Sequence, residues 1–235
     1  MLPILPYPSG SGFFSPLGIP GLLLWFDAAD ASTITVATGV SQWKDKSGHS
    51  NHATQAVAAN QPALQSAAQN GLNTIGFTST APLFFNLTAG VTYPAAFTLA
   101  AIVQVPLSTK KLVILGNATT ANYPFLSENN IYFTDGGGNE LNSQSAVGLA
   151  SYASVILSAG GTPATDVLDV NGVSTPLGTT LTGVVLSSLI YIGQETGDGF
   201  LSDGSIGEII FYNSALNAAP VASLYQYLKH KWGTP

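Results

Sequence analysis

Short runs of apolar residues alternate with turn residues over most of the chain, and this pattern predicts β-strands. The runs are rich in aromatic and β-branched residues and lie at 22–26, 97–105, 111–115, 131–133, 152–157, 165–170, 189–193 and 205–212. Asn171-Gly172 follows one of them and favours a type I′ hairpin turn, because both residues accept positive φ. Many short strands separated by Gly, Asn and Pro predict an all-β sandwich or jelly roll, as one domain over residues 21–235.

One segment, at about 217–232, changes to a helical period. Asn217 is a favourable N-cap, Pro220 is tolerated in the first turn, and Gly233 lies where a helix commonly ends. A single apolar face is formed by Val221, Leu224, Tyr225, Leu228 and Trp232. We expect this helix to pack that face on the sandwich.

Residues 1–20 predict an extended N-terminal arm. Five prolines and three glycines in this stretch disfavour regular structure. The arm is nevertheless apolar, through Leu2, Ile4, Leu5, Tyr7, Phe13, Phe14, Leu17 and Ile19. An apolar extended segment needs a cover, which is either its own domain or a neighbouring subunit.

The composition is poor in charge. Only 8% of the residues are charged, and six lysines with no arginine oppose twelve acids, for a net charge of −6. Nucleic acid is therefore excluded as an expected partner, since its binding needs a basic surface. Such an uncharged surface favours a subunit packed against neighbours, and we expect a homo-oligomer.

The N-terminus lacks the features of a secretory signal. The first charged residue is Asp27, so no basic region precedes the apolar positions. No stretch approaches the roughly 20 uninterrupted apolar residues of a membrane span. We therefore expect a chain made in the cytoplasm without a signal peptide or membrane span. The absence of cysteine excludes disulfides and thiol chemistry.

Two blocks of sequence resemble a known family. The first covers residues 22–32, 40–48 and 51–55, and the second covers 203–216 and 227–233. Together they are similar to the opening and closing strands of LamG-like, concanavalin A-like jelly-roll domains of phage virion and bacterial surface proteins. The resemblance implies an antiparallel β-sandwich. It does not choose a function, because this fold carries lectins, glycosidases and structural modules.

Within these blocks the residue types suggest structural roles. Trp25 and Trp43 are expected in the core, and Asp45-Lys46-Ser47-Gly48 has the composition of a turn. Glu208 lies in an apolar strand and needs a partner, for which Lys44 and Lys46 are the candidates.

No catalytic set is predicted, and we expect a non-enzymatic protein. A glycosidase needs two carboxylates about 5 Å apart, whereas the three-residue spacing of Asp166 and Asp169 directs them to opposite faces of a strand. His49 and His52 lie near Asp45 without a recognisable nucleophile.

The resemblance adds calcium as a candidate ligand, although no cofactor is required. Carboxylate oxygens are the ligands that calcium prefers. The candidates are Asp27, Asp30 and Asp45 in the first loops and Asp198 and Asp203 in the last.

Glycan binding would use exposed aromatic side chains in loops, for which the candidates are Tyr93, Tyr123 and Phe200. The first hypothesis for function is a virion structural protein, such as a capsid decoration, head-fibre or tail-fibre component, that docks on other virion subunits through its arm. The alternatives are a carbohydrate-binding adhesion module for cell-surface glycans, with or without calcium, and a glycoside hydrolase.

Overall fold

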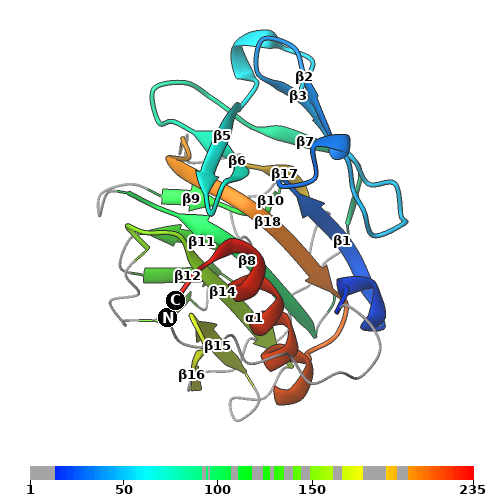
Figure 1. The fold of residues 1–235 in the computed structure, drawn as a ribbon, viewed down its shortest axis with the longest axis vertical. Coiled ribbons are helices and arrows are strands. Elements are labelled where there is room, and N and C mark those ends of the chain that lie inside the picture. Colours follow the sequence, from blue (N-terminus) through cyan, green and yellow to red (C-terminus); the bar gives the residue numbers. More distant parts are fainter. Residues whose placement is uncertain are drawn as a thin grey trace, which may run out of the picture.

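Two antiparallel sheets pack face to face in the computed structural model and form a β-sandwich (Figure 1). The structure describes residues 14–91, 94, 96–106, 111–117, 124–127, 130–134, 140–143, 149–160, 166–176, 189–194 and 201–235. Within these ranges, sheet A has the strand order β16-β15-β14-β8-β18-β6-β5, with β1 also paired to β18. Its strands are β1 (Leu22–Asp27), β5 (Ala63–Gln69), β6 (Leu72–Phe77), β8 (Phe97–Gln104), β14 (Ala153–Ala159), β15 (Val167–Val170), β16 (Val173–Pro176) and β18 (Gly204–Tyr212).

Sheet B lies opposite, with the order β10-β17-β7-β4-β3-β2. Its strands are β2 (Ile34–Val36), β3 (Val40–Trp43), β4 (Ala53–Thr54), β7 (Phe85–Val91), β10 (Gly116–Asn117) and β17 (Leu189–Ile192). A third sheet contains β9 (Lys111–Val113), β11 (Pro124–Ser127), β12 (Asn130–Thr134) and β13 (Glu140–Ser143). Short 3₁₀ turns occur at η1 (Pro16–Gly18), η2 (Ala31–Thr33) and η3 (Ala58–Asn60).

The main core fills the space between sheets A and B. Leu24, Phe26, Phe97 and Phe211 come from sheet A, and Trp43 from sheet B packs against Phe26 with ring centroids 5.3 Å apart. The expectation that Trp43 is a core anchor is thus confirmed. These contacts confirm the predicted all-β sandwich.

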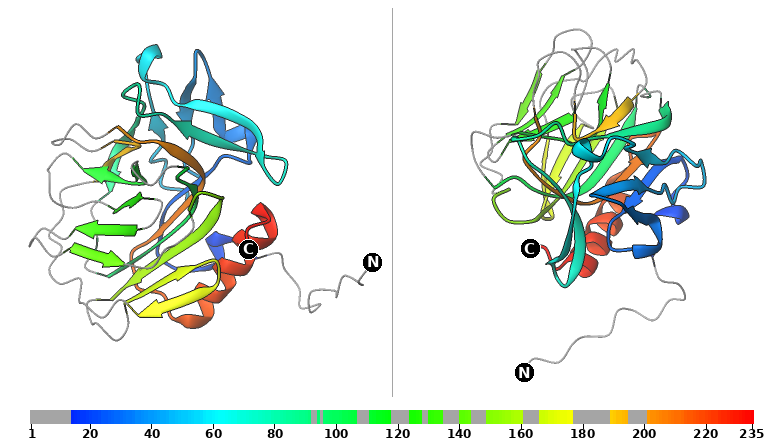
Figure 2. Two further views of the ribbon diagram at one scale, coloured as in Figure 1. Left: turned by 90° about the vertical axis from the view of Figure 1, so that its left-hand side faces the viewer. Right: turned by 90° about the horizontal axis from the view of Figure 1, so that it is seen from above.

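The predicted helix, α1 (Ala218–Trp232), lies across the outer face of sheet A (Figures 1 and 2). Val221, Leu224, Leu228 and Trp232 are buried there, as the apolar stripe predicts, whereas Tyr225 is only half-buried. Asn217 occupies the N-cap position without a capping hydrogen bond from its side chain, and Gly233 adopts the left-handed conformation at φ 63°. The face of α1 therefore forms a second core with sheet A.

The predicted hairpin at Asn171-Gly172 joins β15 to β16. Both turn residues have positive φ, 52° and 82°, as a type I′ turn requires. The Tyr225 ring of α1 packs over this turn, and a Cβ on Gly172 would lie 2.5 Å from Tyr225 Cζ. Glycine is therefore needed here for both its conformation and its lack of a side chain.

Residues 14–20, the described part of the predicted arm, lie on their own domain. Tyr212 Oη donates to the Pro16 carbonyl over 3.0 Å, and the Phe14 ring lies 5.5 Å from that of Tyr227. Ile19 also packs against the second core, while Leu17 is 58% exposed. The domain thus covers Phe14, Pro16 and Ile19 of this segment but not Leu17.

Candidate functional site

A local irregularity in β18 turns one acidic side chain towards α1. Ile206 pairs with Val103 and Glu208 pairs with Ile102, so Gly207 is an extra residue in the strand. A Cβ on Gly207 would lie 2.8 Å from the Trp232 ring, which places Gly207 under the helix. Because of the extra residue, Glu208 also lies on the helix side of sheet A.

Four donors surround the Glu208 carboxylate, which is completely buried. Oε1 accepts hydrogen bonds from Trp25 Nε1 and Tyr227 Oη, each over 2.7 Å. Oε2 accepts from Trp232 Nε1 over 2.7 Å and from Lys231 Nζ over 2.8 Å. Burial raises the pKa of Glu208, and the Lys231 ammonium opposes that rise. Indole and ammonium groups only donate, so the arrangement is complete only with an ionised carboxylate.

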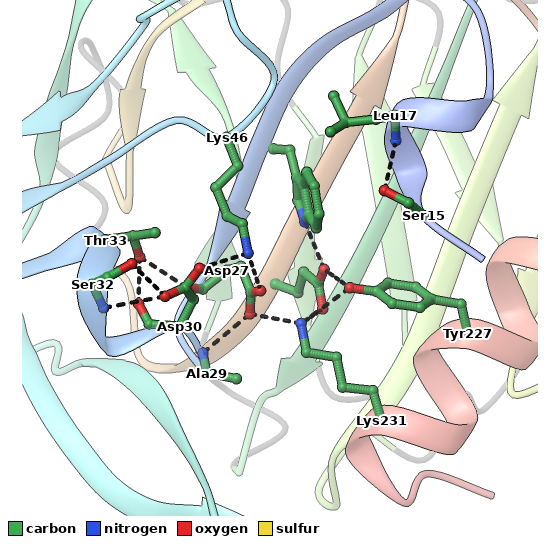
Figure 3. A network of polar contacts seen from close by, with 12 residues as sticks. Ser15, Leu17, Asp27, Ala29, Asp30, Ser32, Thr33, Lys46, Tyr227 and Lys231 are labelled. Atoms are coloured by element: carbon green, nitrogen blue, oxygen red, sulfur yellow. Dashed lines mark hydrogen bonds and ion pairs between the residues drawn. The ribbon is translucent and has the colours of Figure 1, made fainter. Parts of the chain in front are cut away.

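Glu208 is the buried end of a series of ion pairs with alternating charges. Figure 3 shows the other members, Lys231, Asp27, Lys46 and Asp30. Lys231 Nζ also contacts Asp27 at 2.7 Å, and Lys46 Nζ joins Asp27 at 2.9 Å to Asp30 at 2.8 Å. Lys46 and the hydroxyl of Ser32 lower the pKa of Asp30 to about 2. Burial alone would lower the pKa of Lys46, but its hydrogen bonds to Asp30 and Asp27 raise it. These ion pairs link β1 and α1 to β18.

This arrangement corrects the predicted partner of Glu208. Lys231, on α1, forms the ion pair, and neither Lys44 nor Lys46 does so. Lys46 instead lies 4.4 Å above the Trp25 ring while it bridges the two aspartates. Both carboxylate oxygens of Glu208 already accept hydrogen bonds from the protein. The cluster formed by Glu208 and its ion-paired neighbours therefore has a structural role.

The other carboxylates proposed for calcium are also engaged by protein donors. Asp45 organises the loop after β3, accepting from the backbone N–H groups of Trp25, Ser47 and Asn51. Asp203 accepts from the backbone and hydroxyl of Ser79. Asp27 and Asp30 cap turns through the N–H groups of Ala29 and Ser32. Among the described residues, no group of three acidic or histidine side chains is arranged to hold a metal ion.

Several predicted site residues lie outside the described ranges. They are the glycan candidates Tyr93, Tyr123 and Phe200, the calcium candidate Asp198, and the arm residues Leu2, Ile4, Leu5, Tyr7 and Phe13. Their roles stay predictions.

A surface that the sequence did not reveal crosses the outer face of sheet B. Direct cross-strand pairing aligns Thr35 with Gln42, Gln42 with Thr54, Thr54 with Asn86, and Asn86 with Tyr191. Directly paired residues share one face of a sheet, and all five are exposed or half-buried. We call these five residues the outer row. It presents two amides, two aliphatic hydroxyls and one phenol, and carries no formal charge.

An aromatic pair marks one end of the outer row. The rings of Tyr191 and Phe84 meet edge to face with centroids 5.8 Å apart, and both are half-buried. Phe84 lies two residues before Asn86, and side chains two residues apart in extended backbone point to the same face. Within the described ranges, the side-chain amides of Gln42 and Asn86 form no hydrogen bond with the protein, so they are available to a ligand.

A second, shorter row runs beside the first. The register that pairs Trp43 with Ala53 and Ala53 with Leu87 places Lys44, His52 and Thr88 next to one another. His52 Nδ1 accepts from the backbone N–H of Asp45, whereas Lys44 is exposed. The sequence signal for this face is the alternation of Phe85, Asn86, Leu87 and Thr88, in which the apolar residues enter the core and the polar ones face outward.

The comparisons with known proteins identify similar folds. No family model matches the chain, and no curated protein is similar to it in sequence. Among solved structures, it is similar to the binding domain of Paraclostridial Mosquitocidal Protein 1, with a TM-score of 0.62 and 14% identity over 94% of this chain and 56% of that one. It is also similar to the receptor binding domain of botulinum neurotoxin D, with a TM-score of 0.59 and 15% identity over 94% of this chain and 57% of that one.

Trypanosoma rangeli sialidase in complex with the inhibitor DANA is a further similar structure, with a TM-score of 0.55 and 18% identity over 87% of this chain and 32% of that one. This chain therefore spans about half or one third of the length of these proteins. At such low identity the likeness shows the fold alone, a sheet-rich β-sandwich.

Proposed function

We propose that this chain is a non-catalytic binding module that recognises carbohydrate through the outer row of sheet B. The observation that carries the proposal is the alignment of five uncharged hydrogen-bonding residues, from Thr35 to Tyr191, beside the Tyr191–Phe84 aromatic pair. The LamG-like assignment from the sequence blocks stays a prediction.

The chemistry of the outer row is complementary to that of a sugar. The amides of Gln42 and Asn86 each offer donors and an acceptor, and the Thr35 hydroxyl offers both. The Thr54 hydroxyl donates to the Asn86 carbonyl and offers an acceptor. Sugar hydroxyls need such mixed partners. An aromatic ring such as Tyr191 provides an apolar surface for the C–H face of a sugar ring. The solved structures of similar fold include domains described as binding or receptor-binding, which agrees with this proposal.

A binding role is favoured over hydrolysis because the carboxylates with described side chains are already engaged in hydrogen bonds within the protein. A glycosidase needs one carboxyl group to donate a proton and a second to attack or to activate water. The carboxylates with described side chains accept hydrogen bonds from protein donors, and they are Asp27, Asp30, Asp45, Asp166, Asp169, Asp203 and Glu208. The outer row itself contains no acidic residue.

The test is glycan-array binding followed by calorimetry. We expect Asn86→Ala and Tyr191→Ala each to weaken binding about tenfold, which corresponds to the loss of about one hydrogen bond or one stacked ring. Thr175→Ala is the matched control, since Thr175 is exposed on β16 of the other sheet. Equal binding by all three variants would refute the outer row as the site, provided that their melting temperatures agree.

The virion role predicted from the sequence assigns docking on other subunits to the N-terminal arm. It is compatible with a glycan-binding face on sheet B. Its test is sharpened by the contacts of Phe14 and Pro16 with the domain. Removing residues 1–13 leaves these contacts intact, whereas removing residues 1–20 does not. If the arm docks on virion subunits, the shorter deletion abolishes particle association and leaves the melting temperature unchanged. Retained association contradicts the docking role.

A further inference from the structure

We infer that the outer row binds an extended, neutral oligosaccharide lying across the strands of sheet B, rather than a single acidic sugar. This inference rests on the proposed function, because it specifies the ligand class of the same face. Three features of the described structure carry it: the length of the row, its charge and the position of its aromatic end.

The length of the row favours an extended ligand. Thr35, Gln42, Thr54, Asn86 and Tyr191 belong to five neighbouring strands in direct register. Neighbouring strands are about 4.8 Å apart, so the row extends over roughly 19 Å. This is several times the width of one pyranose ring. A monosaccharide would therefore contact only a part of the row, whereas a linear chain of sugars would contact all of it.

The charges of the molecule favour a neutral ligand. Planar, bidentate recognition of a carboxylate is the property of arginine, and the chain contains none. Lys46 and Lys231 are already held by Asp27, Asp30 and Glu208. The net charge of −6 also disfavours the approach of an anion.

Among the described side chains near the outer row, Lys44 is the one that could favour an acidic sugar over a neutral one. It lies two residues after Gln42, just beyond the end of β3, and its side chain is exposed in the second row beside His52. An exposed lysine is a strongly hydrated point charge and holds a carboxylate only weakly. The amides and hydroxyls of the outer row outnumber it, so we assign the binding contacts to them and make Lys44 the discriminating control.

The aromatic end gives the ligand a direction. Tyr191 and Phe84 lie at the β17 side of the row, and the three aliphatic polar residues beyond Asn86 continue towards β2. One sugar ring would stack at Tyr191 while the following sugars exchange hydrogen bonds with Asn86, Thr54 and Gln42. Loss of the Tyr191 ring should therefore weaken the binding of ligands of every length. Loss of a mid-row amide should weaken only the binding of the longer ligands.

The experiment is calorimetry of the full chain with linear glucan, mannan and galactan series, each from the monosaccharide upward, and with sialyllactose as the acidic probe. We expect affinity in one neutral series to rise about tenfold or more with length and then level off. Gln42→Ala should remove the gain for the longer oligomers only. Tyr191→Ala should weaken the binding of oligomers of every length. Lys44→Gln should change neither the affinity nor its dependence on length.

Other outcomes overturn the inference and are distinguishable from one another. Preference for sialyllactose, with loss of binding in Lys44→Gln, would show an acidic-sugar site and leave carbohydrate binding itself intact. Length-independent binding that is insensitive to Gln42→Ala would show a single-sugar site. Binding to none of the neutral or acidic probes would refute both the inference and the proposed function.

Discussion

The Trp232 indole N–H donates a 2.7 Å hydrogen bond to Glu208 Oε2, which joins the last residue of α1 to the middle of β18. The Trp25 indole donates to the other oxygen of the same carboxylate over 2.7 Å. One buried carboxylate thus connects the helix, the first strand and the last strand.

Replacing Glu208 by glutamine should destabilise the fold by about 3 kcal/mol. The amide carries no charge to pair with Lys231, and its own N–H groups would face donors. Urea unfolding should show a lower midpoint with an unchanged slope. Lys229→Gln is the control, because Lys229 lies on the exposed side of the same helix. A midpoint for Glu208→Gln within error of this control would contradict the structural role of the cluster.

Gly207→Ala should also be destabilising, by about 1–3 kcal/mol, through overpacking. The new methyl group would lie 2.8 Å from the Trp232 ring and 2.9 Å from Ile102 Cγ2. Gly18→Ala is a matched control, since no atom lies within 4 Å of the corresponding position and its φ is not positive. Thermal melting of the two variants compares them directly, and equal melting temperatures would argue against close packing at Gly207.

Stability should depend on pH through Asp30 and Lys46. Lys46 and Ser32 lower the pKa of Asp30 to about 2, so its contribution is present above its ordinary pKa of 3.8 and is lost as the pH falls from there towards 2. The pKa of Lys46 is raised, so its contribution is present below 10.5 and is lost as the pH rises above that value.

The Asp30 contribution should be below about 1 kcal/mol, because its side chain is 33% exposed and solvent screens the pair. The measurement is the unfolding midpoint of wild type and Asp30→Asn at several pH values. The difference between them should shrink between about pH 4 and pH 2. A difference that is constant over this range would exclude Asp30 as its source.

Asn70 should stabilise the C-terminal turn of α1 from a distant hairpin. Its side-chain amide donates to the Lys231 carbonyl over 3.0 Å, and Gln69 donates to the Trp232 carbonyl over 2.8 Å. Asn70→Gly keeps the positive φ of 50° but removes the amide, at a cost of about 1 kcal/mol. Hydrogen exchange should quicken in the last helical turn and remain unchanged in the first. Uniform exchange along α1 in the variant would disprove this local effect.

The elements with strong apolar patterns were predictable from the sequence. The run at 205–212 corresponds to β18 (Gly204–Tyr212), and the helix predicted at about 217–232 is α1 (Ala218–Trp232). In contrast, β5 (Ala63–Gln69) was missed because its seven residues include only alanine and one leucine as apolar positions. The dipeptide Asn70-Gly71 behind it, with φ of 50° and 75°, is the turn signal that could have revealed the hairpin.

The sites were harder to predict because they depend on register and on contacts between distant residues. The partner of Glu208 is on a helix, and the extra residue at Gly207 decides which face the carboxylate takes. The outer row consists of ordinary polar residues on separate strands, and β4, which contributes Thr54, is only two residues long. No single segment reveals that Gln42, Thr54 and Asn86 lie side by side.

The hydrogen bond between Trp25 and Glu208 spans 183 residues of sequence. During synthesis the first strand therefore leaves the ribosome long before its partner strand β18 and its covering helix exist. The apolar side chains of β1, including Leu24 and Phe26, must stay exposed or transiently covered until the last segments have been made. Sheet A can therefore be completed only after β18 and α1 have been made, and until then the apolar side chains of β1 lack their native partners.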